Sequence, residues 1–229
     1  MTGRHPVDRP RSLAWLAWWA AAHAGLLLVL VAFRWDEPLS SGLCSWTSTG
    51  AFRTRLLEAL TSWGNPWPVT IIAVGSACLA LARRNVPAAA VLLVVPYAAT
   101  VSCNLVKDWA ERQRPSLGCA SMHADGFGFP SGHAVGVTTG FLLAALYLSA
   151  RTPPAVSTLI LLAAGLSAEL VAWSRVFLGV HFSVDVLAGQ LLGAGWLAVA
   201  ALLLHRRPTR RSRRQVRLPP PNSADEPVA

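Results

Sequence analysis

His181 and Asp185 are two residues whose types and spacing could do chemistry. They stand at positions i and i+4, so a helix that begins near His181 would place an imidazole and a carboxylate on one face. A carboxylate bound to one ring nitrogen fixes the tautomer and leaves the other nitrogen available as a nucleophile. A salt bridge at a helix start would also explain the spacing. Asp185 lies inside an apolar segment, however, where an ionisable side chain indicates a functional site.

A second cluster, Pro130-Ser131-Gly132-His133, immediately precedes an apolar run. Ser131 has the side chain of a helix N-cap. Gly132 allows the backbone to approach a ligand closely, and the N–H groups at a helix start can bind an anion. His133 would then point into an anion site. The alternative is a capped helix start with an incidental histidine.

Three basic residues near these clusters could bind the negative charge of a phosphate. Lys107 is the single lysine among 20 basic residues, and Arg114 follows it at i+7. If the helix of the preceding apolar run continues past the membrane, Lys107 and Arg114 share one face until Pro115 ends it. Arg175 follows Ser174, a few residues before the histidine of the first pair. Convergent cations bind phosphate oxygens, although a charged helix end also explains Lys107 and Arg114.

The elements that must position these residues are membrane-spanning helices. Of the 229 residues, 53% are hydrophobic and 14% are charged, and the mean hydropathy is +0.44. A helix that crosses a bilayer needs roughly 20 mostly apolar residues. The segments that meet or approach this length are 12–33, 66–82, 87–106, 132–150, 155–173 and 184–204. We therefore predict an all-α, polytopic membrane protein with six transmembrane helices.

The distribution of positive charge predicts that both termini are cytoplasmic. With six spans in this orientation, thirteen of the 20 Lys and Arg residues lie inside and seven outside, in agreement with the positive-inside rule. The net charge of +9 is then a topology signal rather than a nucleic-acid surface. We expect a single membrane domain over 1–229 in the plasma (inner) membrane, which contacts the lipid bilayer and no nucleic acid. Residues 205–229 are expected to form a basic, disordered cytoplasmic tail.

The same topology places all three clusters at one membrane face. They lie at the outer ends of the third and fourth spans and between the fifth and sixth spans. Because the counts of basic residues alone define this topology, the agreement is independent of the motifs. We therefore expect the three clusters to form one site on the extracytoplasmic side.

Together the clusters resemble the signature of the type 2 phosphatidic acid phosphatase (PAP2) superfamily, which also includes vanadium-dependent haloperoxidases. The signature positions are all filled, in order, by Lys107-x6-Arg114-Pro115, Pro130-Ser131-Gly132-His133 and Ser174-Arg175-x5-His181-x3-Asp185. Three spaced motifs are far more specific than any one of them. The resemblance covers about 66–204, and it implies a PAP2-type helical core.

The resemblance implies a role for each signature residue. His181 would be the nucleophile that forms a phosphohistidine, and Asp185 would orient it. His133 would act first as general acid and then as general base. The implied phosphate ligands are Lys107, Arg114, Arg175, Ser131 and Gly132. The family mechanism implies no metal ion and no other cofactor, and we expect the two histidines to titrate as a coupled pair.

The function implied by the resemblance is hydrolysis of a lipid phosphate at the extracytoplasmic face. Undecaprenyl diphosphate, phosphatidate and phosphatidylglycerophosphate are all candidate substrates, with a slight preference for the prenyl diphosphate from family analogy. The alternative is a phosphotransferase that passes the phosphoryl group to a hydroxyl acceptor. A non-catalytic scaffold is disfavoured because no signature residue is missing, and a haloperoxidase is disfavoured by the six spans. The sequence does not define an oligomeric state.

The other ionisable residues within spans and loops receive structural interpretations. Glu169, in the fifth span, is interpreted as a buried acid paired with a neighbouring helix, and steering of Arg175 or of a histidine is the alternative. His23, in the first span, is interpreted as a packed or hydrogen-bonded core residue. His123 and Asp125 lie in a glycine-rich loop that we expect to be solvated.

Two loops on the outer side are long enough to carry structure. The first, about 34–65, has an apolar stripe at helical spacing, which predicts a short amphipathic helix in the membrane interface. The stripe consists of Phe52, Leu56, Leu57, Leu60 and Trp63. The second loop, 116–129, shows no periodicity. Cys44 and Cys119 fall in outer loops, where they could form a disulfide or remain as two thiols.

Overall fold

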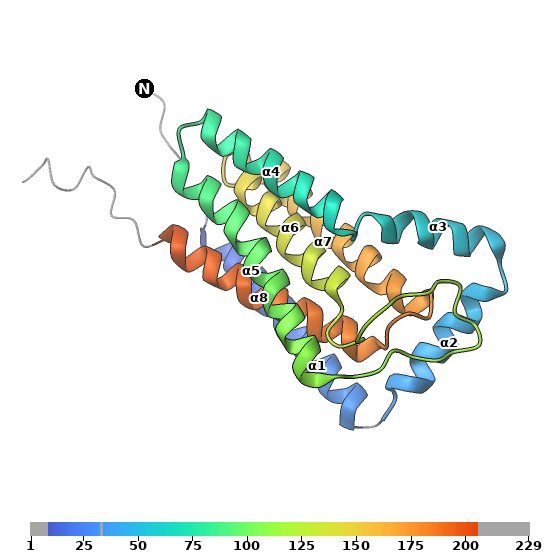
Figure 1. Ribbon diagram of the computed structural model, residues 1–229. Coiled ribbons are helices and arrows are strands. Elements are labelled where there is room, and N and C mark those ends of the chain that lie inside the picture. Colours follow the sequence, from blue (N-terminus) through green and yellow to red (C-terminus); the bar gives the residue numbers. More distant parts are fainter. Residues whose placement is uncertain (1–8, 33, 206–229) are drawn as a thin grey trace, which may run out of the picture.

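The computed structural model describes residues 9–32 and 34–205, and the regular structure in these ranges is helical. Within them, eight helices follow one another along the chain (Figure 1). Their bounds are α1 Arg9–Ala32, α2 Asp36–Ser48, α3 Ala51–Ser62, α4 Pro66–Ala82, α5 Val86–Ala110, α6 Gly132–Ser149, α7 Pro154–Phe177 and α8 Ser183–His205. The predicted basic tail, 205–229, lies outside the described residues apart from its first position.

Four helices, α5, α6, α7 and α8, are each long and apolar enough to cross a membrane. The pairs α1–α2 and α3–α4 pass the same test when each bent pair is taken as one span. The described residues therefore provide four spans, or up to six with the bent pairs, and confirm an all-α polytopic architecture. The predicted span at 66–82 corresponds to α4, whose 17 residues are the lower limit for a single crossing.

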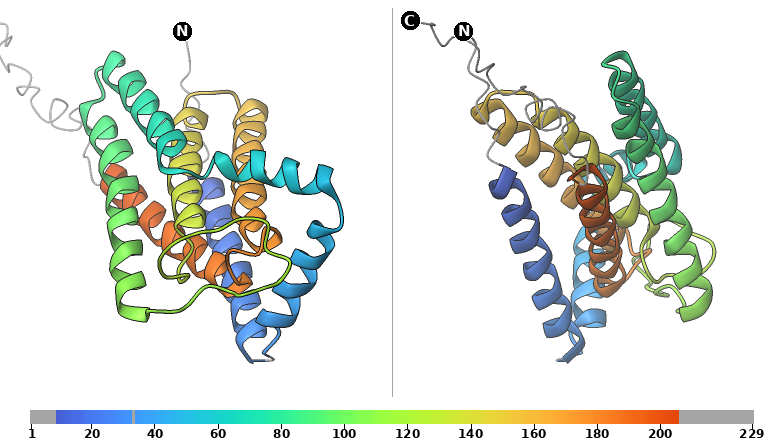
Figure 2. Two further views of the ribbon diagram at one scale, coloured as in Figure 1. Left: turned by 45° about the vertical axis from the view of Figure 1, so that its right-hand side comes forward. Right: turned by 90° about the vertical axis from the view of Figure 1, so that its left-hand side faces the viewer.

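α6 lies in the middle of the bundle (Figures 1 and 2). It packs against α4, α5, α7 and α8, and most of its residues are buried. Small residues allow this close approach, because a Cβ on Gly140 would lie 2.8 Å from Val69 of α4 and a Cβ on Gly193 of α8 would lie 2.8 Å from Thr138. Close packing at small residues is a principal source of helix association in lipid. The bundle thereby fixes the ends of its helices relative to one another.

Two helices occupy the segment 34–65, where the sequence predicts one. α3 contains the predicted amphipathic segment, and its Phe52 and Leu56 are exposed, as expected for a face toward lipid. α2 was not predicted, because small and polar residues dominate its sequence and leave only Leu39, Leu43 and Trp46 at helical spacing. Its start does carry a signal, since Asp36 and Glu37 in the first turn favour a helix N-terminus.

α5 ends earlier than the sequence predicts. Its last residue is Ala110, and Glu111 adopts a left-handed conformation with φ of 45°, which terminates the helix well before Pro115. Arg114 therefore lies in the loop between α5 and α6. The prediction that Lys107 and Arg114 share one helical face is wrong, because the backbone has already turned away from the helix axis at Glu111.

A disulfide between Cys44 and Cys119 joins α2 to the loop between α5 and α6. The two Cα atoms are 5.8 Å apart, and Cys44 is fully buried. Gly179, in the link between α7 and α8, packs against this bond with φ of 75°, and a Cβ there would lie 2.8 Å from Cys44 Sγ. The structure therefore contains the disulfide, one of the two alternatives left open by the sequence, and it brings three chain segments to one point.

Glu169 of α7 is the centre of a polar cluster that holds α1 and α8 against α7. Its Oε1 accepts a hydrogen bond from Trp19 Nε1 at 2.8 Å and lies 3.2 Å from His23 Nε2. Its Oε2 accepts from Gln190 Nε2 at 2.9 Å and from Trp173 Nε1 at 3.2 Å. These contacts agree with the interpretation of Glu169 as an acid paired with neighbouring helices. They also agree with a hydrogen-bonded His23.

Candidate active site

The three sequence clusters meet at the end of the bundle that carries α2 and the loop between α5 and α6 (Figure 1). Ser131, at the start of α6, donates its backbone N–H to the carbonyl of Asp185 at 2.9 Å. Arg114 reaches His181, in the link between α7 and α8, at 2.9 Å. The side chains that act electrostatically on His133 are Lys107, Arg114, Arg175 and His181. The structure therefore brings residues of all three clusters together.

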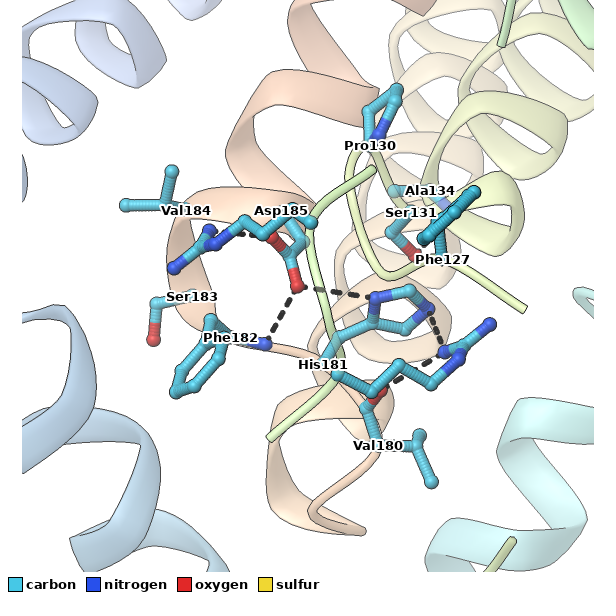
Figure 3. A network of polar contacts seen from close by, with 12 residues as sticks. Phe127, Pro130, Ser131, Ala134, Val180, His181, Phe182, Ser183, Val184 and Asp185 are labelled. Atoms are coloured by element: carbon cyan, nitrogen blue, oxygen red, sulfur yellow. Dashed lines mark hydrogen bonds and ion pairs between the residues drawn. The ribbon is translucent and has the colours of Figure 1, made fainter. Parts of the chain in front are cut away.

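His181 and Asp185 make the contact that their spacing predicts. Nδ1 of His181 lies 3.3 Å from Oδ2 of Asp185, and both side chains are buried (Figure 3). α8 begins at Ser183, so His181 just precedes the helix and Asp185 lies in its first turn. Oδ2 of Asp185 also accepts the backbone N–H of Phe182 at 2.9 Å. One carboxylate thus holds the imidazole and the helix start together.

Arg114 determines which nitrogen of His181 carries the proton. Its Nη1 lies 2.9 Å from Nε2 of His181 and also donates to the carbonyl of Val180 at 3.0 Å. A guanidinium can only donate hydrogen bonds, so Nε2 must accept with its lone pair. The ring proton is then on Nδ1, where it faces the Asp185 carboxylate. The lone pair of the neutral ring is therefore on Nε2, on the side that faces Arg114.

Burial keeps His181 uncharged. The ring is 2% exposed, and burial lowers its pKa from 6.5 to about 4. Asp185 opposes this shift through its hydrogen bond and its charge, whereas the positive charges of Arg114 and Arg175 add to it. At neutral pH the imidazole is consequently neutral, as a nucleophile must be.

In the part of the chain that the structure describes, His133 and Arg175 each have a buried side-chain nitrogen without a hydrogen-bond partner. Ser131 caps α6 as predicted, because its Oγ accepts the backbone N–H of Ala134 at 3.5 Å, and His133 follows in the first turn. Nε2 of His133 and Nε of Arg175 have no hydrogen-bond partner among the described residues. Nη1 of Arg175 donates to Thr61 Oγ1 at 3.0 Å. Buried nitrogens of this kind need a hydrogen-bond partner, and phosphoryl oxygens can accept from Arg175 Nε and from His133 Nε2 when Nε2 carries a proton.

Lys107 lies in the last turn of α5 and contacts the loop between α5 and α6. Its Nζ donates to the carbonyl of Phe127 at 2.7 Å. Arg114 donates from Nε to the carbonyl of Gly126 at 3.0 Å and from Nη2 to the carbonyl of Asp125 at 3.0 Å. Three consecutive carbonyls therefore bind the two cations that the sequence assigns to phosphate. The side chains of His123 and Asp125, by contrast, are 91% and 98% exposed, as expected for a solvated loop.

Sequence reasoning missed Arg112. Its guanidinium lies between two carboxylates, with Nη1 2.6 Å from Oδ1 of Asp185 and Nη2 2.8 Å from Oδ2 of Asp36. The available signal was the position of Arg112 within the signature segment that runs from Lys107 to Arg114. Its pairing with Asp36 of α2 had no sequence signal, because α2 itself was not predicted.

The connection between α3 and α4 also reaches the site without a sequence signal. Thr61 binds Arg175, as described above, and Gly64 lies against His133. A Cβ on Gly64 would be 2.6 Å from Cδ2 of His133 and 2.8 Å from Cγ1 of Val171. Glycine at this position therefore lets the α3–α4 corner close over the imidazole.

Comparison with known proteins places this fold and these motifs in a family. A family model described as the PAP2 superfamily matches residues 88–209, which is more than half of the chain. The chain belongs to the PAP2 superfamily. The matched range contains all three clusters and the loop that joins α5 to α6.

Two curated relatives match parts of the chain. Phosphatidylglycerophosphatase B of Bacillus subtilis is 38% identical over 91 residues, which cover 39% of this chain and 44% of the relative. Undecaprenyl-diphosphatase of Sulfolobus acidocaldarius is 40% identical over 72 residues, which cover 31% of each protein. The matched part thus spans less than half the length of either relative.

A solved structure confirms the architecture over most of the chain. The crystal structure of a transmembrane PAP2-type phosphatidylglycerolphosphate phosphatase from Bacillus subtilis matches with a TM-score of 0.69. The match covers 84% of this chain and 98% of the other, at 23% identity. At this identity the likeness establishes a shared fold.

Replacement of Gly64 by alanine should displace His133 and lower turnover. The new Cβ cannot fit 2.6 Å from the imidazole, and a displacement of about 1 Å at a catalytic group can cost roughly 100-fold in rate. We therefore expect kcat for phosphate release to fall roughly 10- to 100-fold. Gly75→Ala in α4 is the matched control, because nothing lies within 4 Å of its Cβ position. Equal activity of the two variants would contradict the close contact with His133.

The pH dependence of activity should report the neutral state of His181. If His181 is the nucleophile, as the sequence leads us to expect, only its unprotonated ring can react, so kcat/KM should fall as the pH drops through the pKa of His181 in the free enzyme. With that pKa at about 4, the acid limb is expected near pH 4 and not near 6.5. The measurement is kcat/KM for a lipid phosphate in detergent micelles from pH 3 to pH 9. Because kcat/KM also reports ionisation of the substrate phosphate, an NMR titration of the His181 ring in the free protein gives this pKa directly, and a value above 6 would contradict the effect of burial.

Proposed function

We propose that this PAP2 protein is a phosphatase that hydrolyses a lipid phosphate through a phosphohistidine intermediate. The observation that carries the proposal is the orientation of His181, whose Nδ1 faces Asp185 while Nε2 faces the guanidinium of Arg114. A neutral nucleophile beside several cations suits attack on an anionic phosphorus centre. The names of the two relatives, a phosphatidylglycerophosphatase and an undecaprenyl-diphosphatase, support a phosphate carried on a lipid.

In the first step, the lone pair on Nε2 of His181 attacks phosphorus, and the bond from phosphorus to the leaving oxygen breaks. The electron pair of that bond stays on the leaving oxygen, which takes a proton from His133. Asp185 stabilises the positive charge that develops on the His181 ring. The non-bridging phosphoryl oxygens accept hydrogen bonds from Lys107, Arg114, Arg175, Ser131 and the backbone N–H of Gly132.

In the second step, water replaces the histidine on phosphorus. His133 accepts a proton from the water, and the water oxygen forms the new bond to phosphorus. The bond from phosphorus to Nε2 of His181 breaks, and its electron pair returns to the nitrogen. One water is consumed, and inorganic phosphate is released. The other product is a lipid alcohol from a monoester or a lipid monophosphate from a diphosphate.

His133 has to be protonated at the start of this cycle, although burial, the neighbouring cations Arg175, Arg114 and Lys107, and the start of α6 all disfavour a cation there. The negative charge of the bound phosphate offsets these effects. His133 and His181 therefore titrate as a coupled pair in the proposed mechanism.

The proposal places the site on the extracytoplasmic face of the plasma (inner) membrane, with both termini in the cytoplasm. The charge asymmetry of the sequence supports this orientation. The disulfide between Cys44 and Cys119 supports it independently, because it lies at the site end of the bundle and disulfides persist in oxidising compartments. A lipid substrate would enter from the outer leaflet.

Replacement of His181 by alanine should abolish phosphate release. We expect a loss of roughly 10⁴-fold or more, as when the nucleophile of a catalytic triad is removed. The test uses purified protein and a panel of phosphatidylglycerophosphate, undecaprenyl diphosphate and phosphatidate, with and without EDTA. Wild-type protein should also give an acid-labile phosphoenzyme that His181→Ala lacks.

Three results of this panel would contradict the proposal. They are full activity of His181→Ala, strict dependence on a metal ion, and no phosphate release from any lipid. An added alcohol serves as a further control, because transfer of the phosphoryl group to it in preference to water would identify a phosphotransferase.

The orientation can be tested with one added cysteine in a Cys78→Ser background, where the remaining free thiol, Cys103, is buried. His123→Cys, in the exposed loop at the site end, should react with a membrane-impermeant maleimide in intact cells. Arg83→Cys, exposed at the other end of the bundle between α4 and α5, should react only after the membrane is permeabilised. The reverse pattern would place the site on the cytoplasmic face.

A further inference from the structure

Arg112 touches no predicted phosphate ligand, yet it contacts the carboxylate behind the proposed nucleophile. Its Nη1 lies 2.6 Å from Oδ1 of Asp185, and its Nη2 lies 2.8 Å from Oδ2 of Asp36. The Asp185 side chain is fully buried, the Asp36 side chain is 15% exposed, and the Arg112 side chain is 34% exposed. A planar guanidinium can hold two carboxylates at once in a fixed geometry, which a lysine ammonium cannot do as well.

The first two turns of α2 also hold the start of α8. Oδ1 of Asp36 accepts the backbone N–H of Val184 at 3.0 Å, and Oγ of Ser40 accepts the backbone N–H of Ser183 at 3.0 Å. These N–H groups have no partner within α8, because they belong to its first turn. Asp36 therefore has two functions in the fold, since one carboxylate oxygen caps α8 and the other binds Arg112.

Arg112 is itself fixed by contacts other than the two carboxylates. Its guanidinium lies 4.6 Å from the centre of the Phe182 ring, and its carbonyl accepts the backbone N–H of Gly128 at 2.7 Å. The guanidinium thus has a fixed backbone behind it and an aromatic face beside it. Arg112 is held in place on the side of Asp185 that faces away from the imidazole.

Both oxygens of Asp185 are consequently occupied from different directions. Oδ1 accepts from Arg112. Oδ2 accepts from Phe182 N–H and faces Nδ1 of His181 (Figure 3). Without Arg112, Oδ1 would be a buried charged atom without a donor, and the carboxylate could rotate to find one. Such a rotation would remove Oδ2 from the His181 ring.

We infer that Arg112 and Asp36 form a positioning bridge that fixes the Asp185 carboxylate against Nδ1 of His181. The inference rests on the proposed function of His181 as the nucleophile. Neither Arg112 nor Asp36 contacts the reacting atoms, so both act through Asp185. The bridge also makes α2, the helix joined by the disulfide to the loop, a support of the catalytic pair.

Arg112→Gln tests the bridge through turnover. At metal sites, mutation of a residue that hydrogen-bonds to a metal ligand costs roughly 10- to 100-fold in activity or affinity. We expect kcat of Arg112→Gln to fall within this range, with little change in KM. Arg112→Lys should recover only part of the loss, because it restores charge without the two-carboxylate geometry. Arg55→Gln, an exposed arginine of α3, is the charge-matched control and should retain wild-type kcat.

A second readout does not depend on finding the substrate. In the wild type, the His181 Nδ1 proton is shared with a buried carboxylate, so it should exchange slowly and give a resolved NMR resonance. The same resonance should weaken or disappear in Arg112→Gln and persist in Arg55→Gln. If no lipid is hydrolysed, the proposed function fails, and this resonance still decides whether the bridge positions the pair.

Asp36→Asn tests the other half of the bridge and guards against misfolding of Arg112→Gln. We expect kcat to fall roughly 5-fold, because asparagine keeps one oxygen to accept the Val184 N–H but presents an NH2 group, which cannot accept, to Arg112. In the Arg112→Gln background the same change should have little further effect, since the bridge is already broken. Glu37→Gln, an exposed acid in the same turn, is the matched control.

Four outcomes would overturn the inference. They are an unchanged kcat and resonance in Arg112→Gln, full recovery by Arg112→Lys, additive losses in the double variant, and a loss confined to KM. A fall in kcat that only follows a fall in the folded fraction, measured by thermal unfolding, would also overturn it.

Discussion

The buried carboxylate of Asp185 is the constraint around which this end of the protein is organised. A charged side chain in a membrane helix is stable only when paired and hydrogen-bonded. Asp185 is fully buried, and its donors are the guanidinium of Arg112 and the backbone N–H of Phe182, with the His181 ring beside them. Its own carbonyl accepts the N–H of Ser131 and so fixes the start of α6. The loop, α2, α6 and the link between α7 and α8 are all held at this one residue.

The bilayer explains why the site lies at helix ends. Irregular backbone is tolerated within the hydrocarbon only where protein or water satisfies it, so a cluster of loops and helix starts belongs at the membrane boundary. Helix starts also supply unpaired N–H groups, which suit anions. At Gly136 and Gly140, α6 packs closely against Val69 of α4, so this apolar part of the bundle has no room for a polar site. The polar groups of the site therefore lie at the end of the bundle.

Local features of the sequence predicted the local parts of the site. The contact between His181 and Asp185 and the Ser131 cap each involve residues three or four positions apart, so spacing was sufficient. The contact of Arg112 with Asp185 spans 73 positions, and that of Arg175 with Thr61 spans 114. Neither the hydrophobic periodicity nor the composition of the sequence indicates contacts between residues so far apart in the chain. The end of α5 was mispredicted for a different reason, since a left-handed residue other than glycine or asparagine gives no sequence signal.

The position of Arg114 links substrate binding to the nucleophile under the proposed function. In this structure its Nη1 donates to Nε2 of His181, and Nε and Nη2 donate to carbonyls of the loop. The lone pair that must attack phosphorus is therefore held by a cation that the substrate also needs. A phosphoryl oxygen competes well for this donor, because a charge-assisted hydrogen bond to an anion is stronger than one to a neutral ring nitrogen. When Nη1 turns to the phosphate, Nε2 is released toward phosphorus, so the nucleophile is exposed only when its target is bound.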